Sequence, residues 1–201
     1  MSRAPDDVLL AQGDPPSKRK VLRCALHLFV RDGLCETSIR DIAKASGYTN
    51  PALYKFFESK EALALHLFER CHLRLVSVTR ESQRPDRDFE ANLNALLGAF
   101  ARMIDDNLEA VLYVNDTLRI FWPKLPPSTK RCSFLNVVRD LLVQGVRDRA
   151  LRRGTDVDLA LATIVGATAQ VARMAYFGEL KGSAAGHVKG LGALFLRGVS
   201  K

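Results

Sequence analysis

The sequence predicts an all-α protein, and three observations support that fold class. Apolar residues recur at helical spacing along most of the chain, as they do on one face of a helix. Gly, Pro, Ser, Thr and Asp gather between these stretches, where helices begin and end. No alternating run of β-branched residues bounded by turns predicts a strand. With 201 residues, 47% of them hydrophobic and 26% charged, the chain is long enough to bury a core in one or two domains.

The chain is expected to begin with a disordered arm over residues 1–16, which hold three prolines and three aspartates and little apolar surface to bury. The first helix is predicted from Ser17, because an apolar stripe then recurs at helical spacing, and Gly33 ends it. The stripe consists of Val21, Leu22, Ala25, Leu28 and Phe29.

Two short helices and a longer one are expected next. Thr37 is predicted as the N-cap of the second helix, which ends after two turns at Gly47. Thr49 is expected to cap the third helix, with Pro51 just inside it, where a missing N–H costs nothing. Ser59 is expected to cap the fourth.

The remaining two thirds of the chain are predicted to be helical, with Pro or Gly between the helices. The expected ranges are 60–80, 87–104, 107–122, 128–152, 157–178 and 187–199. Together with the first three, they give about nine helices in total.

The chain is basic, with 30 Lys and Arg against 22 Asp and Glu, a net charge of +8. Both halves of the chain share the excess, but residues 17–60 hold nine basic and four acidic side chains. A local excess of this kind makes a polyanionic partner plausible for this segment.

Several kinds of function are disfavoured. No P-loop, G-x-G-x-x-G, G-x-S-x-G or H-E-x-x-H motif is present and the four histidines are scattered, so no enzyme and no catalytic residue are predicted. The four cysteines form no C-x-x-C pair, so neither a metal site nor a cofactor is predicted. Without a signal peptide or a long uncharged apolar segment, the protein is expected to be cytoplasmic and to have no membrane partner.

The second and third predicted helices are joined by Ser46, Gly47 and Tyr48, and with the supporting first helix they make a helix-turn-helix arrangement. The third helix, which is short, can enter the major groove of DNA and read base edges, while the second crosses the DNA backbone. The run TSIRDIAKASGYT (37–49), followed by ALYKFFESKEAL (52–63), resembles the DNA-binding domain of the TetR family of bacterial transcriptional regulators. The resemblance covers about residues 17–76, and the remainder matches in being helical and of the expected length.

This resemblance implies an N-terminal three-helix DNA-binding domain at residues 17–62, with the motif at about 37–57, and a larger helical domain at 63–201 for ligand binding and dimerisation. It implies DNA contacts from Thr37, Arg40, Thr49, Asn50, Pro51, Ala52, Tyr54, Lys55 and Lys60. Asn50 is the best base reader among them, since an amide can bond adenine in two places, and Lys55 can reach guanine or phosphate.

A small effector would occupy an apolar pocket between helices of the second domain. The candidate lining residues are aromatic or methionine side chains: Phe100, Met103, Tyr113, Phe121, Trp122, Phe134, Met174 and Phe177. Ordinary core packing is the alternative for each of them. Because Arg119 and Lys124 are the nearest charges to the favoured pair, Phe121 and Trp122, the effector is expected to be neutral or weakly anionic.

The resemblance also implies a homodimer formed by the last two helices. Small residues along 157–178 allow another helix to approach closely, and the final helix carries an apolar stripe. The candidate interface residues are Ala162, Gly166, Ala169, Leu191 and Phe195. A core within one chain is the alternative.

The sequence therefore favours a sequence-specific transcriptional regulator, expected to be a homodimeric repressor. Its partners would be double-stranded operator DNA, a second copy of itself and an unidentified small apolar ligand that releases it from the operator. A helical scaffold or adaptor without DNA binding is the alternative.

Overall fold

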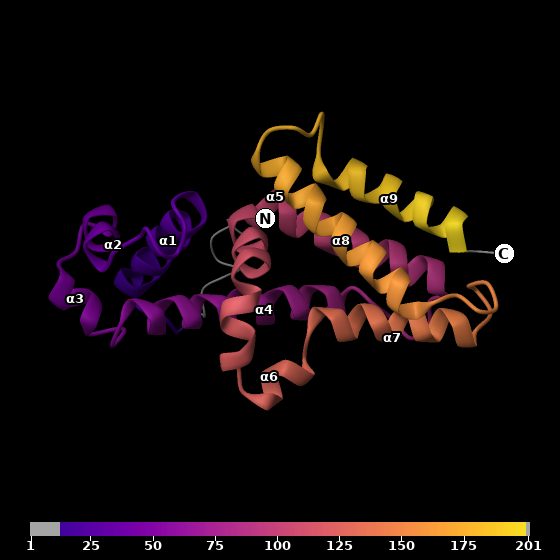
Figure 1. The fold of residues 1–201 in the computed structure, drawn as a ribbon, viewed down its shortest axis with the longest axis horizontal. Helices are drawn as coiled ribbons and strands as arrows, with labels where there is room; N and C mark the ends of the chain where they lie inside the picture. The colour runs from indigo at the N-terminus through magenta and orange to yellow at the C-terminus, as the bar shows by residue number, and fades with distance from the viewer. Residues whose placement is uncertain (1–12, 200–201) are drawn as a thin grey trace.

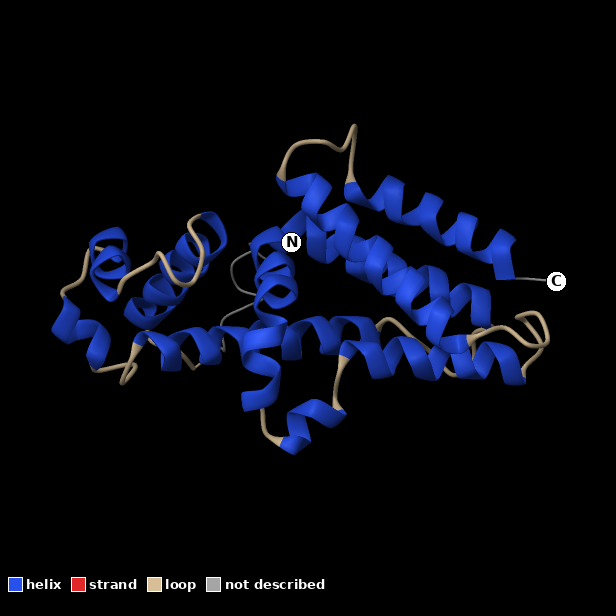
Figure 2. Ribbon diagram, in the orientation of Figure 1, coloured by secondary structure: helices blue, strands red, loops and turns tan. Residues whose placement is uncertain are grey.

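The computed structural model describes residues 13–199, which fold into nine α-helices and one short 3-10 helix (Figure 1). The helices are α1 (Pro16–Arg31), α2 (Ile39–Ser46), α3 (Asn50–Tyr54), α4 (Lys60–Glu81), α5 (Phe89–Phe121), η2 (Trp122–Lys124), α6 (Pro127–Arg131), α7 (Phe134–Arg147), α8 (Val157–Tyr176) and α9 (Ala184–Val199). No strand occurs between residues 13 and 199 (Figure 2). The all-α prediction is confirmed.

The molecule is elongated, with α1, α2 and α3 at one end and a larger bundle of α5, α7, α8 and α9 at the other (Figure 1). α4 starts in the small unit and continues along the bundle, so it connects the two ends. The small unit shares one buried cluster with the first half of α4 and the last part of α5. Its members include Val21, Leu22, Ile42, Leu53, Leu63, Leu67, Tyr113 and Phe121.

Side-chain caps explain where α2 and α4 begin. Ser38, rather than the predicted Thr37, is the N-cap of α2, and its hydroxyl accepts from the N–H of Asp41 at 3.2 Å. The Asp41 carboxylate accepts in return from the N–H of Ser38 at 2.9 Å, which completes a capping box. Ser59 caps α4 as predicted, and accepts from the N–H of Ala62 at 3.0 Å. The prediction of Thr37 was wrong by one residue because two adjacent hydroxyl residues are equally good caps by type.

α5 combines the two helices predicted over 87–104 and 107–122. The helix is continuous except at Asn107, whose φ of −146° and ψ of 48° are not helical. The residues before this kink pack in the bundle, while Tyr113 and Phe121 beyond it pack in the small unit's cluster. The predicted break is therefore a change of direction within one helix.

The single helix predicted over 128–152 is wrong. The chain leaves helical geometry at Cys132 (φ −97°, ψ 60°), and Ser133 then caps α7 by accepting from the N–H of Asn136 at 3.1 Å. α7 ends at Arg147, and Arg149 adopts a φ of 60° in the following turn. Neither break involves a Gly or Pro, so the usual helix-breaking signals are missing from the sequence.

Glycine is required where α5 meets α7. A Cβ added to Gly145 would lie 2.5 Å from Cδ2 of Phe89, closer than real Cβ contacts. The absence of a side chain at Gly145 therefore lets α7 approach the first turn of α5 closely.

The predicted disordered arm lies mostly outside the described residues, but its last part, 13–16, has a defined structure. The Asp14 carboxylate pairs with the ammonium of Lys18 at 3.1 Å and with the guanidinium of Arg70 in α4. The Asp14 carbonyl also accepts from Nε of Arg19 at 2.9 Å. Disorder was the wrong prediction for these residues, because their charged partners come from α1 and from a distant helix.

Candidate nucleic-acid interface and ligand cavity

The turn between α2 and α3 is shaped by Gly47. Its φ of 73° lies in the left-handed region that glycine adopts without strain. The N–H of Tyr48 then donates to the carbonyl of Ala43 at 3.0 Å, so the chain reverses direction immediately after α2. The result is a short α3 that projects Pro51 and its neighbours from the end of the molecule.

Most of the predicted DNA contacts are accessible on this unit. Those exposed are Arg40, Thr49, Pro51, Tyr54 and Lys55, and those half-buried are Asn50 and Ala52. Thr49 stands at the N-cap position of α3, as predicted, but its hydroxyl makes no capping hydrogen bond. Tyr54 is 52% exposed, so its hydroxyl is open to an external acceptor. These residues offer amide, hydroxyl and cationic groups from one end of the protein.

Thr37 and Lys60 are engaged inside the protein, contrary to their predicted phosphate contacts. Thr37 is 2% exposed, and its hydroxyl donates to the carbonyl of Gly33 at 2.9 Å. The ammonium of Lys60 donates to the carbonyls of Leu34 at 2.9 Å and Thr37 at 3.0 Å. Both side chains hold the loop between α1 and α2 in place. Family resemblance marked them as important but could not separate an internal role from a DNA contact.

Lys20 of α1 is an exposed cation that the sequence analysis did not single out. Its ammonium lies 5.8 Å from the centre of the Tyr48 ring, beside the turn of the helix-turn-helix. A Cβ at Gly47 would lie 3.5 Å from the same nitrogen. The sequence did contain a signal for this residue, because Lys20 lies in the basic segment 17–60, two residues after Lys18.

A cavity of about 440 Å³ opens in the bundle between α4, α5, η2, α7 and α8. Its lining is mainly apolar and includes Leu75, Val114, Leu118, Trp122, Pro123, Phe134, Leu135 and Val165. The polar lining residues are His72, Asn115, Arg119 and Ser133. Such a cavity suits a ligand with a largely apolar body.

Two of the eight predicted pocket residues, Trp122 and Phe134, line this cavity. The others do not line it, and most of them pack in the two cores: Phe100, Met103, Tyr113 and Phe121 are buried, Met174 is half-buried and Phe177 is 69% exposed. Six of the eight predicted lining residues were wrong for this cavity because an aromatic residue at helical spacing is found in a core as readily as in a pocket wall. His72 and Asn115 were missed because polar residues within helices gave no signal.

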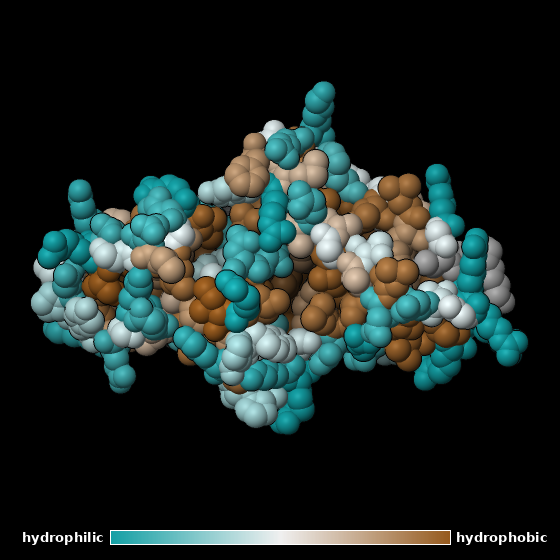
Figure 3. Space-filling model, in the orientation of Figure 1, coloured by the Kyte–Doolittle hydropathy of each residue, from teal (hydrophilic) through white to brown (hydrophobic). Residues whose placement is uncertain are grey.

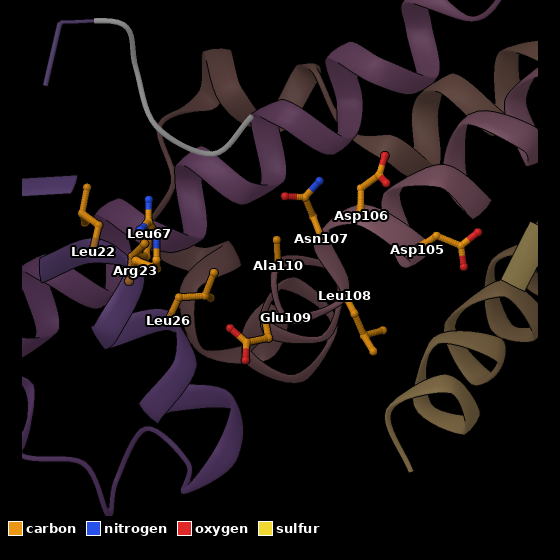
Figure 4. Close-up of a pocket in the computed structure, with 10 residues that line it drawn as sticks. All are labelled: Leu22, Arg23, Leu26, Leu67, Asp105, Asp106, Asn107, Leu108, Glu109 and Ala110. Carbon is orange, nitrogen blue, oxygen red and sulfur yellow. The ribbon is translucent and has the colours of Figure 1, made fainter. Parts of the chain in front are cut away.

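A second cavity, of about 280 Å³, lies between α1 and the kink of α5 (Figure 4). Leu22, Arg23 and Leu26 of α1 line it together with Asp106 and Glu109 of α5, and the Glu109 side chain lies near Leu26. Its position places it where the small unit meets the bundle. Its carboxylates make it a poor site for an anion.

The outer faces of α8 and α9 are apolar and open. Leu159 of α8 and Leu194 of α9 are 66% and 67% exposed, and both line a groove of about 530 Å³. Hydrophobic residues are visible at the surface of this end of the molecule (Figure 3). α8 is also the one helix between residues 13 and 199 long and apolar enough to cross a membrane, which is weak evidence because it packs against α5, α7 and α9.

The predicted dimer residues differ in accessibility. Ala162 and Gly166 are exposed, and Ala169 and Leu191 are half-buried. Phe195 is 7% exposed and belongs to the core of its own chain, so it offers little surface to a second copy. Leu194, which belongs to the apolar stripe expected on the last helix, and Leu159 of α8 are the more exposed large apolar residues of the same two helices.

Comparison with known proteins decides the family. Residues 21–67 match the family model described as bacterial regulatory proteins, tetR family. The HTH-type transcriptional repressor KstR2 of Rhodococcus jostii is 30% identical over 156 residues, which cover 74% of this chain and 74% of that protein. The chain belongs to the TetR family. It is therefore a DNA-binding transcriptional regulator, and α1–α3 with the start of α4 form its helix-turn-helix unit.

Solved TetR-family structures share the whole fold. The ketosteroid transcriptional regulator KstR2 of Mycobacterium tuberculosis superimposes with a TM-score of 0.80 at 23% identity, over 96% of this chain and 99% of that one. FadR of Bacillus subtilis, solved in complex with stearoyl-CoA, gives a TM-score of 0.70 at 15% identity, over 90% of this chain and 98% of that one. The similarity covers far more of the chain than the segment that the family model matches. Between residues 13 and 199, no group of three His, Cys, Asp or Glu side chains is arranged to hold a metal.

Proposed function

We propose that this TetR-family regulator is a homodimeric repressor that a small apolar ligand releases from its operator. The ligand occupies the cavity lined by Trp122 and Phe134. The observation that carries this proposal is the path of α4. Its first half, with Leu63 and Leu67, belongs to the core of the helix-turn-helix unit, while His72 and Leu75 of the same helix line the cavity.

This path gives a ligand a direct mechanical route to the DNA-binding unit. A ligand that displaces the middle of α4 also displaces the first half of the same helix, which packs against α1 and follows α3 in the chain. The shift in population depends on the ligand binding one arrangement more tightly than the other. Release therefore requires that the ligand-bound arrangement hold the α3 helices of the two chains, the proposed recognition helices, at a spacing unsuited to the operator.

The DNA contacts are assigned to the accessible residues of α2, α3 and their flanks. The proposed set is Lys20, Arg40, Thr49, Asn50, Pro51, Ala52, Tyr54 and Lys55. Asn50 would read base edges from α3, since amides pair with adenine, and Lys55, directly after α3, would contact a phosphate. Tyr54 and Thr49 would donate to phosphates, which fix position on the duplex without reading sequence.

The outer face of α8 and α9 is assigned to dimerisation. Leu159, Ala162, Gly166 and Leu194 lie on two adjacent helices with their side chains or backbone exposed. Pairing this face around a twofold axis would bury it and place two recognition helices on successive half-sites, about 34–36 Å apart or a multiple of that distance. Sedimentation should then give the mass of two chains.

The ligand is expected to be apolar and neutral or weakly anionic. The cavity has a mainly apolar lining, and Arg119 is the charged residue that borders it. A lipid-like molecule fits this description, and the structurally similar FadR was solved with stearoyl-CoA. Because the CoA part of stearoyl-CoA carries several negative charges, a neutral long-chain alcohol such as 1-decanol is the first probe for this cavity.

A gel-shift titration tests the proposal. DNA from the region upstream of the protein's own gene should give a specific retarded band, and affinity should fall with salt because phosphate contacts release counterions. An apolar effector should remove the band, with 1-decanol as the first to be tried. A Tyr54→Phe, Lys55→Ala variant should lose most of the affinity. The absence of any specific band, or full affinity in this variant, would contradict the proposed DNA interface.

A further inference from the structure

The cavity of about 280 Å³ between α1 and the kink of α5 has both apolar and acidic lining residues (Figure 4). Asp105, Asp106 and Glu109 of α5 supply three carboxylates, and Arg23 of α1 supplies one guanidinium. The wall therefore carries a net negative charge, which favours a cation over an anion. Its apolar surface comes largely from leucines of α1 and α4, namely Leu22, Leu26 and Leu67.

The three carboxylates are not equally available to a ligand. The Asp105 carboxylate accepts from the N–H of Ala184 at 3.1 Å, and the carboxylate of Glu109 lies 2.7 Å from Nδ1 of His27. Asp106 is exposed and has no hydrogen-bond or ion-pair partner in the described part of the chain. Asp106 is therefore the carboxylate that is free to pair with a cation.

Asn107, the next residue, lines the same cavity with an amide that has no partner. The residue is 8% exposed, yet its side chain makes no hydrogen bond with any described residue. A buried amide left unpaired is costly, and proteins satisfy most such groups with protein, water or a ligand. The two amide atoms are not fully buried, as Nε2 of His66 and of His72 is, so a molecule in the cavity can reach them. Figure 4 shows the Asn107 amide and the Asp106 carboxylate projecting from α5 to the same side of the kink.

We propose that this cavity is a second ligand site, which binds a primary amine with a small apolar body. An ammonium group has three donors and no acceptor, so it can donate both to the Asp106 carboxylate and to Oδ1 of Asn107. The apolar body then packs on Leu22 and Leu26 of α1. A ligand held in this way contacts α1 and α5 at once, and it stabilises the arrangement in which the DNA-binding unit meets the bundle. The site is independent of what fills the 440 Å³ cavity.

Three probes of the same length separate the charge from the apolar body. Hexylamine is a cation at pH 7, as the lysine side chain is, whereas 1-hexanol is neutral and hexanoate is an anion. Calorimetry should show that the wild-type protein binds hexylammonium about tenfold more tightly than 1-hexanol, a difference of about 1.4 kcal/mol. Trp122 is the one tryptophan in the sequence and lines the larger cavity, so its fluorescence should not change when hexylammonium binds.

The variants assign that preference to named side chains. Asp106→Asn keeps the shape of the residue and removes its charge, so it should weaken hexylammonium binding about tenfold and leave 1-hexanol binding unchanged. Asn107→Leu removes the amide and should also weaken hexylammonium binding. Asp140→Asn is the matched control, because Asp140 is an exposed carboxylate of α7 that does not line the cavity. This control should keep the wild-type affinity.

Each contrary result overturns the amine site. It fails if the wild type binds hexylammonium no more tightly than 1-hexanol, or if Asp106→Asn and Asp140→Asn weaken binding equally. It also fails if hexylammonium changes the Trp122 fluorescence with an affinity that Asp106→Asn leaves unaltered, because the amine then occupies the larger cavity. Asp106 is exposed, so Asp106→Asn should fold and decides the question even if Asn107→Leu does not fold by circular dichroism.

Discussion

The hydroxyl of Tyr113 in α5 donates to the backbone carbonyl of Ala64 in α4 at 2.9 Å, deep in the core that joins the helix-turn-helix unit to the bundle. Tyr113 is 1% exposed and stacks on Phe29 of α1 at 5.8 Å. One side chain therefore ties together three helices from both ends of the molecule. Burial raises the pKa of its phenol, so the group stays protonated and remains a donor.

Removing this hydroxyl should weaken the fold without affecting the ligand cavity. Tyr113→Phe keeps the ring and loses one buried hydrogen bond, which is typically worth about 1 kcal/mol of unfolding free energy. Urea titration followed by circular dichroism measures this loss. Trp122→Phe is the comparison, because Trp122 borders the cavity and its substitution should change ligand affinity. Altered ligand affinity in Tyr113→Phe, measured by calorimetry, would show that this core and the cavity are not separate.

Lys55 and Lys60 should respond differently to substitution. Lys55 is exposed at the end of α3, so Lys55→Gln should reduce the slope of log affinity against log salt by about 0.9, the value expected for one lost phosphate contact. Lys60 binds backbone carbonyls in the α1–α2 loop. Lys60→Met should therefore lower stability by about 1–3 kcal/mol and leave the salt slope unchanged.

Gel shifts over a range of salt concentrations, paired with urea titrations, separate the two roles. A reduced salt slope in Lys60→Met with unchanged stability would contradict the internal role and support the phosphate contact that the family resemblance implied for Lys60.

Asp14 should make the fold more sensitive to acid. Burial raises the pKa of its carboxyl, but the hydrogen bonds from Arg70 and Lys18 outweigh this effect, and the pKa lies below its ordinary 3.8. A carboxyl with a lower pKa in the folded than in the unfolded chain stabilises the fold above the unfolded pKa. That contribution is lost as the pH falls through the folded pKa.

Asp14→Asn should therefore be less stable than the wild type at pH 7, and the difference should shrink as the pH falls below about 3.8, the ordinary pKa of the carboxyl. Urea titrations at a series of pH values measure this difference in unfolding free energy between the variant and the wild type. A difference that stays constant down to the lowest pH would mean that the ion pairs with Lys18 and Arg70 add nothing to stability.

The apolar face of α8 and α9 should control the oligomeric state. Leu194 is 67% exposed, so Leu194→Glu should leave the protomer folded but place a charge in the proposed interface, giving a monomer in sedimentation. Leu73→Glu is the matched control, since Leu73 is 41% exposed on α4, away from this face. The Leu73→Glu variant should remain a dimer in sedimentation. A Leu194→Glu protein that is still dimeric would place the interface elsewhere.

The helix-turn-helix unit could be predicted from the sequence because its determinants are local. Gly47, Pro51 and Ser59 act within a few residues of themselves, and their structural roles follow from residue type. Lys60 shows the limit of this reasoning: its carbonyl partners lie more than twenty residues earlier in the chain, so its internal role depends on tertiary packing.

The ligand cavity could be predicted only in part for the same reason. Phe121 and Trp122 are adjacent in sequence, yet Phe121 packs in the core while Trp122 lines the cavity. Which of two neighbouring aromatic residues faces a cavity depends on where α4, α7 and α8 pass, and periodicity within one helix does not contain that information.

The kink at Asn107 has a consequence for engineering. Because it turns the second half of α5 toward α1, the side chains that complete the DNA-binding core come from about fifty residues beyond the segment that the family model matches. A chimaera that joins α1–α3 to another regulator's sensing module at the end of α3 would leave the apolar surface of Leu22 and Phe29 without Tyr113 and Phe121. Functional exchange of modules should instead require that α4 and the C-terminal half of α5 be transferred together with α1–α3.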